Sequence, residues 1–299
     1  MTLAIIVTDR CTKELTEYLQ VLQSDLEIQV WPNINDPSAV EYAVLWKQPK
    51  KVLADFKNLK AVTSLGAGTD FITSDPDLPV NIPVHRIVTP FLKQQMAQYI
   101  LAYVLHDCRE LNTYRVQQQN KLWKVNDVSP KIIGLLGLGS IGKFVAERFL
   151  DLGFETIAYT HNSNDEVVEC FHGEKGLKHV MEKSDYIVCL LPLTNQTKGL
   201  LNKERFAYCT KKPMLIQVGR GEQLVENDLL EALNKGIVRQ AIIDVFAIEP
   251  LPIDHVFWDR KDISITPHNS ARSDNRQTAQ EIHKWLLLQV DNKSLGYNK

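Results

Sequence analysis

The segment 132–142, which reads IIGLLGLGSIG, determines the fold that we expect for this chain. Ile132–Leu136 is a short apolar run of the kind found in buried parallel strands, and an amphipathic stretch after the segment predicts a helix. Between them the glycines are spaced as GxGxxG. Gly137 permits the tight turn, Gly139 lets the backbone approach a pyrophosphate, and Gly142 permits close packing of helix and strand.

A bare GxGxxG match is weak evidence, because it also occurs in ordinary glycine-rich turns. Here a further strand at Thr156–Thr160 follows the helix, as a dinucleotide-binding βαβ unit requires. The free N–H groups at the helix N-terminus would face the phosphates. The residues predicted to form this loop are Gly137, Gly139, Ser140, Ile141 and Gly142.

The end of the next strand bears on the choice of cofactor. An NAD-preferring site usually has an acid here for the ribose hydroxyl, but this chain has Thr160, His161, Asn162 and Ser163. These side chains could hydrogen-bond a 2′-phosphate, although no arginine follows and only His161 could carry charge. We therefore expect NADP(H) to be favoured, with NAD(H) as the alternative.

Alternating strands and helices predict an α/β protein with two domains. The N-terminal part has one candidate helix, Thr12–Gln23, and a long helical stretch near Lys93–Lys121 leads to the second series. The expected strands are Leu3–Val7, Leu26–Trp31, Tyr42–Trp46, Ala61–Leu65 and Val84–Val88, then Ile132–Leu136, Thr156–Thr160, Tyr186–Leu191, Met214–Val218, Ala241–Val245 and Ile263–Thr266. A last helix, expected at Ser273–Gln289, lies beyond this series and could return to the first domain.

The bulk composition narrows the functional classes. The 299 residues include 34 basic and 36 acidic side chains, so no basic surplus suggests nucleic acid or an anionic membrane as a partner. Five scattered cysteines with no CxxC pair fit a reducing compartment, and no run is long enough for a membrane span. We expect a cytoplasmic protein without a metal site.

Three residues with complementary chemistry each follow a predicted strand: Arg220, Glu249 and His268. Each alone would pass for an ordinary loop residue, but ligands of open α/β sheets bind beyond the carboxyl ends of the strands, so we expect all three at one crevice. A histidine can exchange the proton of a carbonyl reduction, a carboxylate can orient it, and a guanidinium can clamp a substrate carboxylate. We predict His268 as acid/base, Glu249 as its orienter and Arg220 as substrate clamp and electrophile.

The first domain should supply the other wall of the substrate site. The turn SLGAG after a predicted strand contains Leu65, Gly66, Ala67 and Gly68, whose backbone N–H groups could bind a carboxylate. Trp46 ends a neighbouring strand, where it would be either a substrate-facing wall or part of the core.

The motifs GLGSIG, VGRGEQL, DVFAIEPLP and TPHNSA, in this order and spacing, resemble the D-isomer-specific 2-hydroxyacid dehydrogenases over nearly the whole chain. Within that family, VLWKQP, SLGAGTDFI, QQM and LWK look most like the glyoxylate/hydroxypyruvate reductase A subgroup. The resemblance implies reduction of glyoxylate and hydroxypyruvate, preferably with NADPH.

The resemblance also implies a domain organisation and further site residues. It implies two Rossmann-like domains and a homodimer built around the cofactor domain. Residues 1–93 and 272–299 would form a flavodoxin-like substrate-binding domain, and 94–271 the NAD(P)-binding domain. Arg220, Glu249 and His268 match the catalytic residues of the family, and Ala67 and Gly68 match its backbone clamp for the substrate carboxylate. Further residues expected at the cofactor are Leu190, Pro192, Thr197, Val218, Gly219 and Asp244.

The chain departs from the family pattern at Asn269, Gln95 and the loop Gln217–Gly221, and none of these changes removes a catalytic group. Two other functions remain open from the sequence. One is a different dehydrogenase on this scaffold, acting on formate, phosphoglycerate or lactate. The other is a non-catalytic NAD(H)-sensing binding protein, which the complete Arg–Glu–His set disfavours.

Overall fold

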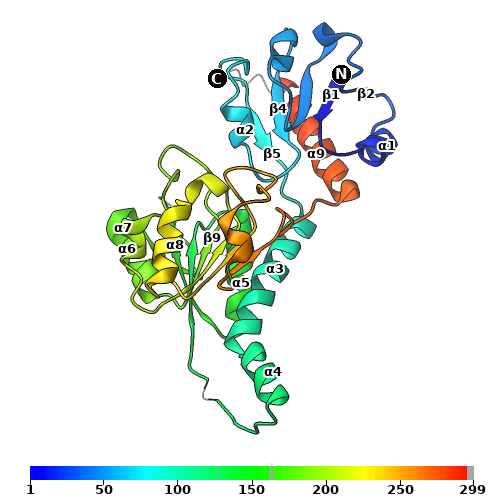
Figure 1. The fold of residues 1–299 in the computed structure, drawn as a ribbon. Helices are drawn as coiled ribbons and strands as arrows, with labels where there is room; N and C mark the ends of the chain where they lie inside the picture. The colour runs from blue at the N-terminus through cyan, green and yellow to red at the C-terminus, as the bar shows by residue number, and fades with distance from the viewer. Residues whose placement is uncertain (127, 162–163, 295–299) are drawn as a thin grey trace. The chain divides into compact units, whose positions relative to one another are not determined.

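The computed structural model describes residues 1–126, 128–161 and 164–294 (Figure 1). The predictions at Asn162 and Ser163 lie outside the described residues. The chain forms two compact units, one of Met1–Leu92 with the segment that begins at Ser273, and one of Lys93–Arg272. Each unit has its own parallel sheet.

The first unit contains a five-stranded parallel sheet in the order β2-β1-β3-β4-β5, which is the order of flavodoxin-like folds. Its strands are β1 (Thr2–Val7), β2 (Glu27–Val30), β3 (Tyr42–Trp46), β4 (Ala61–Ser64) and β5 (Val84–Arg86). Its helices are α1 (Lys13–Leu22), α2 (Asp70–Thr73) and α9 (Asn275–Ser294), with 3₁₀ turns at Pro37–Ala39 and Val52–Asp55.

The last helix of the chain belongs to this first unit. α9 packs against α1, and its residues Ala279, Ile282, Trp285 and Leu286 are buried in the same core as the strands β1 and β3. The Trp285 ring meets Tyr42 edge-on with ring centres 5.8 Å apart. The core of this unit is therefore built from both ends of the sequence.

The second unit contains a seven-stranded parallel sheet in the order β12-β11-β10-β9-β6-β7-β8. The strands are β6 (Ile132–Leu136), β7 (Glu155–Tyr159), β8 (Glu169–Phe171), β9 (Tyr186–Cys189), β10 (Met214–Gln217), β11 (Gln240–Ile243) and β12 (Ile263–Ile265). The strand order reverses between β6 and β9, which is the point where Rossmann sheets bind their ligand. The predicted α/β class with Rossmann-like domains is confirmed.

Helices cover both faces of this second sheet. The helices are α4 (Leu111–Gln119), α5 (Ser140–Asp151), α6 (Gly173–Lys183), α7 (Lys203–Phe206) and α8 (Glu226–Asn234), with 3₁₀ turns at Gly221–Gln223 and Val256–Asp259, while α3 (Pro90–Cys108) spans the boundary between the units in sequence. Alternate strand residues form two cores, one with α3 and α5 and the other with α6 and α8. Burial on both faces explains why these strands are continuous apolar runs in the sequence.

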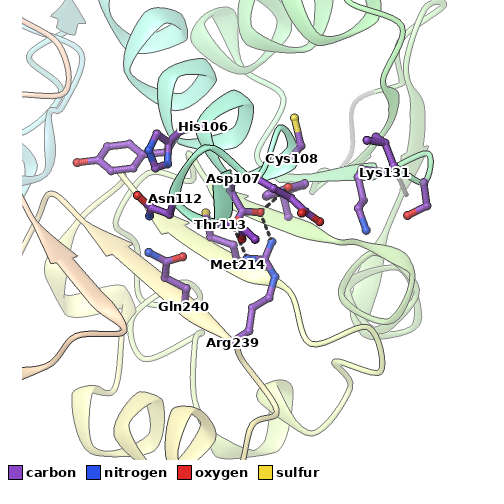
Figure 2. A pocket seen from close by; sticks show the side chains of 14 residues that line it. His106, Asp107, Cys108, Asn112, Thr113, Lys131, Met214, Arg239 and Gln240 are labelled. Atoms are coloured by element: carbon purple, nitrogen blue, oxygen red, sulfur yellow. Dashed lines mark hydrogen bonds and ion pairs between the residues drawn. The ribbon is translucent and has the colours of Figure 1, made fainter. Parts of the chain in front are cut away.

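The predicted long helix over residues 93–121 is wrong in one respect, because it is two helices. α3 ends at Cys108, and Glu110 takes a left-handed conformation (φ 52°) before α4 begins. Asp107 is fixed by Arg239, whose two terminal nitrogens lie 2.9 and 2.8 Å away, and by the Tyr186 hydroxyl at 2.6 Å (Figure 2). Contacts with distant residues at the last turn of α3 therefore accompany the break, which neither proline nor glycine marks.

The sequence also left one strand unpredicted. β8 has only three residues, and it pairs with the outer side of β7. Its sequence, ECF, lacks the apolar run that identified the other strands of this sheet. In the described part of the chain, no helix is long and apolar enough to cross a membrane.

Candidate active site

The glycine loop after β6 has the geometry that a dinucleotide needs. Gly137 has φ 107°, and a side chain on Gly142 would place its Cβ only 2.3 Å from the carbonyl oxygen of Gly137. Gly139, the N-cap of the twelve-residue helix α5, has no atom within 4 Å of the position of a Cβ. Ser140 is exposed, while Ile141 is half-buried. The open space at Gly139, next to the free N–H groups of α5, fits a pyrophosphate.

The residue that follows β7, Thr160, contacts another side chain of the second unit. Thr160 is 3% exposed, and its hydroxyl lies 3.0 Å from Nδ1 of His172, while His161 is exposed. The other ring nitrogen of His172 lies 2.8 Å from the side-chain oxygen of Asn164. The Thr160 hydroxyl therefore faces a protein partner, and His172 is a basic side chain that the sequence analysis did not single out.

A second pair near this strand end also escaped the sequence analysis. Lys143 Nζ lies 2.7 Å from an oxygen of Asp165, and this hydrogen bond holds the pKa of the Asp165 carboxyl below its usual value. The same contact raises the pKa of Lys143. The negative charge of Asp165 is thus compensated by a cation from α5.

The loop after β9 is held by its own hydroxyl and by a buried glutamine. Thr197 Oγ1 donates to the carbonyl of Pro192 at 2.6 Å, and Gln223 donates to the carbonyls of Leu191 and Pro192 at 3.0 and 3.1 Å. Leu190 is half-buried and Pro192 is exposed. The predicted cofactor residues of this loop therefore share one closed turn.

The departure of Gln217–Gly221 from the family pattern has a structural reason. The side chain of Gln217 accepts from the N–H of Gly219 at 3.2 Å and donates to the carbonyl of Arg220 at 3.0 Å. Gln223 Oε1 accepts from the N–H of Arg220 at 2.8 Å and would lie 2.3 Å from a Cβ on Gly219. The buried Gln223 side chain and the carbonyl of Leu191 thus fill the space that an alanine at 219 would enter, and the neighbouring Val218 is 6% exposed.

Gly221 brings two of the predicted catalytic loops together. A Cβ at this position would lie 1.9 Å from the backbone carbon of Phe246, so only glycine permits this approach. Phe246 begins the loop after β11 that ends at Glu249, and its N–H donates to Glu249 Oε1 at 3.1 Å. Arg220, whose guanidinium donates to the carbonyl of Gly219 at 2.9 Å, is adjacent to Gly221 in the chain.

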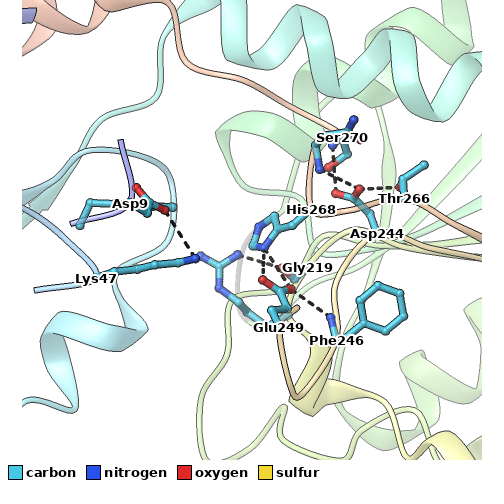
Figure 3. Close-up of polar contacts among 12 residues, drawn as sticks. Asp9, Lys47, Gly219, Asp244, Phe246, Glu249, Thr266, His268 and Ser270 are labelled. Carbon is cyan, nitrogen blue, oxygen red and sulfur yellow. Dashed lines mark hydrogen bonds and ion pairs between the residues drawn. The ribbon is translucent and has the colours of Figure 1, made fainter. Parts of the chain in front are cut away.

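Asp244 anchors the third loop (Figure 3). Its fully buried carboxylate accepts from the Thr266 hydroxyl at 2.6 Å and from the N–H groups of Asn269 and Ser270 at 2.9 and 3.0 Å. The Thr266 hydroxyl also lies 2.6 Å from that of Tyr99, whose pKa is raised by burial. The sequence analysis missed both Thr266 and Tyr99.

This anchored loop presents His268 to Glu249. Nδ1 of His268 lies 2.8 Å from Oε2 and 3.1 Å from Oε1 of Glu249 (Figure 3). The imidazole side chain is 36% exposed and the carboxylate 26% exposed. With Nδ1 occupied by the carboxylate, Nε2 is the ring nitrogen left to meet a substrate.

The first unit carries the remaining predicted residues at the carboxyl ends of its strands. The Trp46 ring packs over Gly66, where an added Cβ would lie 3.2 Å from a ring carbon. Leu65 is buried and donates from its N–H to the carbonyl of Leu45 at 3.0 Å. Among the described residues, the N–H groups of Ala67 and Gly68 have no recorded protein acceptor. This arrangement fits a carboxylate-binding turn.

No three His, Cys, Asp or Glu side chains in the described parts of the chain are grouped so that they could hold a metal ion.

Comparison with known proteins shows the family of the chain. The family profile "D-isomer specific 2-hydroxyacid dehydrogenase, NAD binding domain" matches residues 101–270. A curated glyoxylate/hydroxypyruvate reductase A of Yersinia enterocolitica is 36% identical over 270 residues, which cover 86% of each chain. A second, from Serratia proteamaculans, is 35% identical over 254 residues, covering 82% of this chain and 81% of its own.

Two solved structures resemble the chain along almost its whole length. The NADPH-dependent glyoxylate/hydroxypyruvate reductase of Sinorhizobium meliloti, in complex with NADP and sulfate, has a TM-score of 0.87 and 28% identity, covering 99% of this chain and 96% of its own. A D-isomer-specific 2-hydroxyacid dehydrogenase of Xanthobacter autotrophicus, in complex with NADPH and MES, has a TM-score of 0.87 and 32% identity, covering 95% and 92%.

The fold and the site are those of an NAD(P)-dependent dehydrogenase with Rossmann-like domains. The chain belongs to the D-isomer-specific 2-hydroxyacid dehydrogenase family. The predicted family, its similarity to the reductase A subgroup and the prediction of an NAD(P)-dependent enzyme are confirmed.

Proposed function

We propose that this protein reduces small 2-oxo acids, glyoxylate and hydroxypyruvate among them, to 2-hydroxy acids with NADPH as the preferred cofactor. The contact between His268 Nδ1 and Glu249 is the observation that supports it most directly, because it leaves Nε2 to serve as a proton donor. The names of the curated relatives support the substrate class.

Each predicted residue has a defined part in this reaction. The bound nicotinamide supplies the hydride. His268 delivers the proton to the carbonyl oxygen, and Glu249 stabilises the charged imidazole and fixes its orientation. Arg220 offers paired donors to the substrate carboxylate and polarises the carbonyl. The N–H groups of Ala67 and Gly68 are suited to bind a substrate carboxylate as well, in the unit to which we assign substrate binding (1–93 and 272–299).

The cofactor assignment rests on the residues around the end of β7, in the part (94–271) to which we assign cofactor binding. No acid directly follows β7, Asp165 further along is paired with Lys143, and His161 and His172 add two basic side chains, although the exposed Glu166 beside Asp165 is also acidic. Two similar solved structures contain NADP or NADPH. We therefore propose NADP(H) over NAD(H), with the hydroxyl of Thr160 holding the strand end through His172.

We also propose a homodimer in the cytoplasm. α4 and the segment after it expose apolar side chains, with Trp123 fully exposed, Val125 82% exposed and Leu122 60% exposed. Clustered apolar surface of this kind is typical of a protein interface, and a second copy of the chain is the partner that the family resemblance implies. The five unpaired cysteines fit a reducing compartment.

The decisive experiment measures initial rates with glyoxylate, hydroxypyruvate, pyruvate and phenylpyruvate against NADPH and NADH. We expect kcat/KM to be highest for glyoxylate and hydroxypyruvate with NADPH. No turnover of any 2-oxo acid would end the enzymatic proposal and leave a nucleotide-binding protein. A clear preference for NADH would refute only the cofactor proposal. A preference for pyruvate or phenylpyruvate would refute only the substrate assignment.

A further inference from the structure

Four side chains at or just after the carboxyl ends of β1 and β3 form one polar cluster in the first unit. Asp9 Oδ2 accepts from the Trp46 indole N–H at 3.0 Å. The same oxygen lies 3.5 Å from Lys47 Nζ (Figure 3). Arg10 Nε donates to Asp9 Oδ1 at 2.9 Å, and the Arg10 guanidinium lies 5.3 Å from the centre of the Trp46 ring. We call Asp9, Arg10, Trp46 and Lys47 the β1–β3 cluster.

The β1–β3 cluster has more positive than negative charge. Its two cations face one carboxylate, which leaves a net charge of +1. Burial opposes ionisation of Asp9, but the hydrogen bonds and charges of Arg10, Trp46 and Lys47 hold its pKa below the usual value. The Asp9 side chain is 29% exposed, whereas Arg10 is 46% and Lys47 56% exposed. The carboxylate is shielded and both cations reach solvent, so the cluster is suited to bind an additional anion.

The position of the cluster connects it with substrate. Arg10 and Lys47 follow the carboxyl ends of two neighbouring strands, where α/β sheets bind their ligands. The Trp46 ring packs on Gly66, in the turn whose Ala67 and Gly68 N–H groups we assign to the substrate carboxylate. A substrate whose carboxylate is bound at this turn would therefore have the Trp46 ring beside its carbon chain. The Arg10 guanidinium lies over that ring, and Lys47 is the next residue in the sequence.

We propose that Arg10 and Lys47 select 2-oxo acids that carry a second anionic group, a carboxylate or a phosphate, at the far end of the carbon chain. This inference rests on the proposed function and adds to it a preference among longer 2-oxo acids, for a charged acid over a neutral acid with the same carbon chain. Asp9 limits the selection, because it competes with the substrate anion for the same two cations.

The test compares substrates of matched length that differ in the distal charge. 2-Oxoglutarate is paired with 2-oxopentanoate, and 3-phosphohydroxypyruvate is paired with hydroxypyruvate. The quantity measured is the ratio of kcat/KM for the charged substrate to that for its partner. Lys47→Met and Arg10→Met should each lower this ratio by about threefold to twentyfold, the range between an exposed ion pair and a charged hydrogen bond. Added salt should lower the wild-type ratio as well.

A substitution that is expected to raise the ratio distinguishes a loss of anion selectivity from general structural damage. Asp9→Asn keeps an oxygen for the Trp46 indole but removes the competing charge, so it should raise the ratio while Lys47→Met lowers it. Lys57→Met is the matched control, because Lys57 is an exposed lysine that precedes β4 and so lies toward the other end of the strands. This control should leave the ratio unchanged.

The outcomes distinguish the two proposals. A ratio that responds only in the 2-oxoglutarate pair identifies a distal carboxylate, and one that responds only in the phosphorylated pair identifies a phosphate. If the enzyme reduces glyoxylate but none of the three cluster variants alters either ratio, the proposed selection by Arg10 and Lys47 is wrong, while the proposed function stands. An enzyme that reduces no 2-oxo acid would overturn the proposed function and this inference with it.

Discussion

His268 holds a left-handed backbone conformation (φ 50°), which is unfavourable for a residue with a side chain. The surrounding hydrogen bonds maintain it. The His268 N–H donates to the carbonyl of Asp244 at 2.9 Å, and the Asp244 carboxylate holds the two N–H groups that follow His268. A buried carboxylate thus fixes the position of the imidazole that we assign to proton transfer.

Replacing His268 by alanine should remove the proton donor without disturbing the glycine loop. We expect His268→Ala to lower kcat/KM for glyoxylate by about 10²–10⁴-fold, the usual contribution of a general acid. The Kd for NADPH, measured by fluorescence titration, should change by less than about threefold. His106→Ala is the control, because His106 lines a pocket at the start of the strands of the second sheet (Figure 2). An unaltered rate in His268→Ala would remove the assignment.

The cysteines should differ sharply in reactivity. Burial raises the pKa of both Cys189 and Cys209 to about 12, so only about one thiol in ten thousand is ionised at pH 8. Cys11 is exposed. With dithiobis(nitrobenzoate) at pH 8, we expect Cys11 to react first and the two buried thiols to react only after unfolding in guanidinium. Rapid labelling of all five in the native protein would contradict the described burial.

At the scale of single elements, substitutions at two positions of the glycine loop should affect different properties, cofactor binding in one case and stability in the other. Gly139→Ala places a methyl group in open space, whereas Gly142→Ala places one 2.3 Å from a carbonyl oxygen. Gly139→Ala should keep the melting temperature within about 2 °C and weaken NADPH binding. Gly142→Ala should lose about 1–3 kcal/mol of stability through overpacking. Calorimetry and cofactor titration of both variants check this, and an unchanged Kd in Gly139→Ala would show that the pyrophosphate lies elsewhere.

The helix α9 should be essential to the first unit. Trp285 is 3% exposed and contacts Tyr42, so Trp285→Ala should cost about 3–5 kcal/mol. Leu288→Ala, on the exposed side of the same helix, should cost less than about 0.5 kcal/mol. Urea unfolding followed by circular dichroism gives both values. Equal losses would mean that α9 does not pack as described.

Most elements could be predicted from the sequence because each produces a local pattern. The strands β6, β9 and β10 are apolar on both faces, and the glycine spacing identifies the loop that follows β6. The break between α3 and α4 could not be predicted, because Asp107 is bound by Tyr186 and Arg239, which are distant in sequence. β8 is too short and too polar to produce a periodic pattern.

The site was predictable to a similar extent. Arg220, Glu249 and His268 follow strands and belong to recognisable motifs. Thr266, Tyr99 and Lys143 act through hydrogen bonds to distant residues, and a single sequence carries no signal for such pairs. The glycine at 219 departs from the family pattern, and the close approach of Gln223, which no local sequence pattern reveals, accounts for it.

At the scale of the whole molecule, the exposed apolar surface after α4 tests the proposed homodimer. Trp123→Ser should shift the protein from dimer to monomer in analytical ultracentrifugation, since an exposed tryptophan is a strong candidate for an interface anchor. Val21→Ser, which alters an apolar residue on α1 that is 84% exposed, should leave the dimer intact. A wild-type monomer at micromolar concentration would refute the dimer itself.

The first unit is assembled from the two ends of the chain, and this arrangement affects how the protein is made. Domains usually fold as units while the ribosome is still working. All of the second unit has been synthesised once Arg272 has been added. The strands β1 and β3 are made earlier than the second unit, yet their apolar side chains lack the packing partners Trp285 and Leu286 until α9 has been translated. We expect the nascent chain to contain a folded second unit while the first unit is unfinished, so β1 and β3 become protected from chaperones and proteases only after strands that are made later.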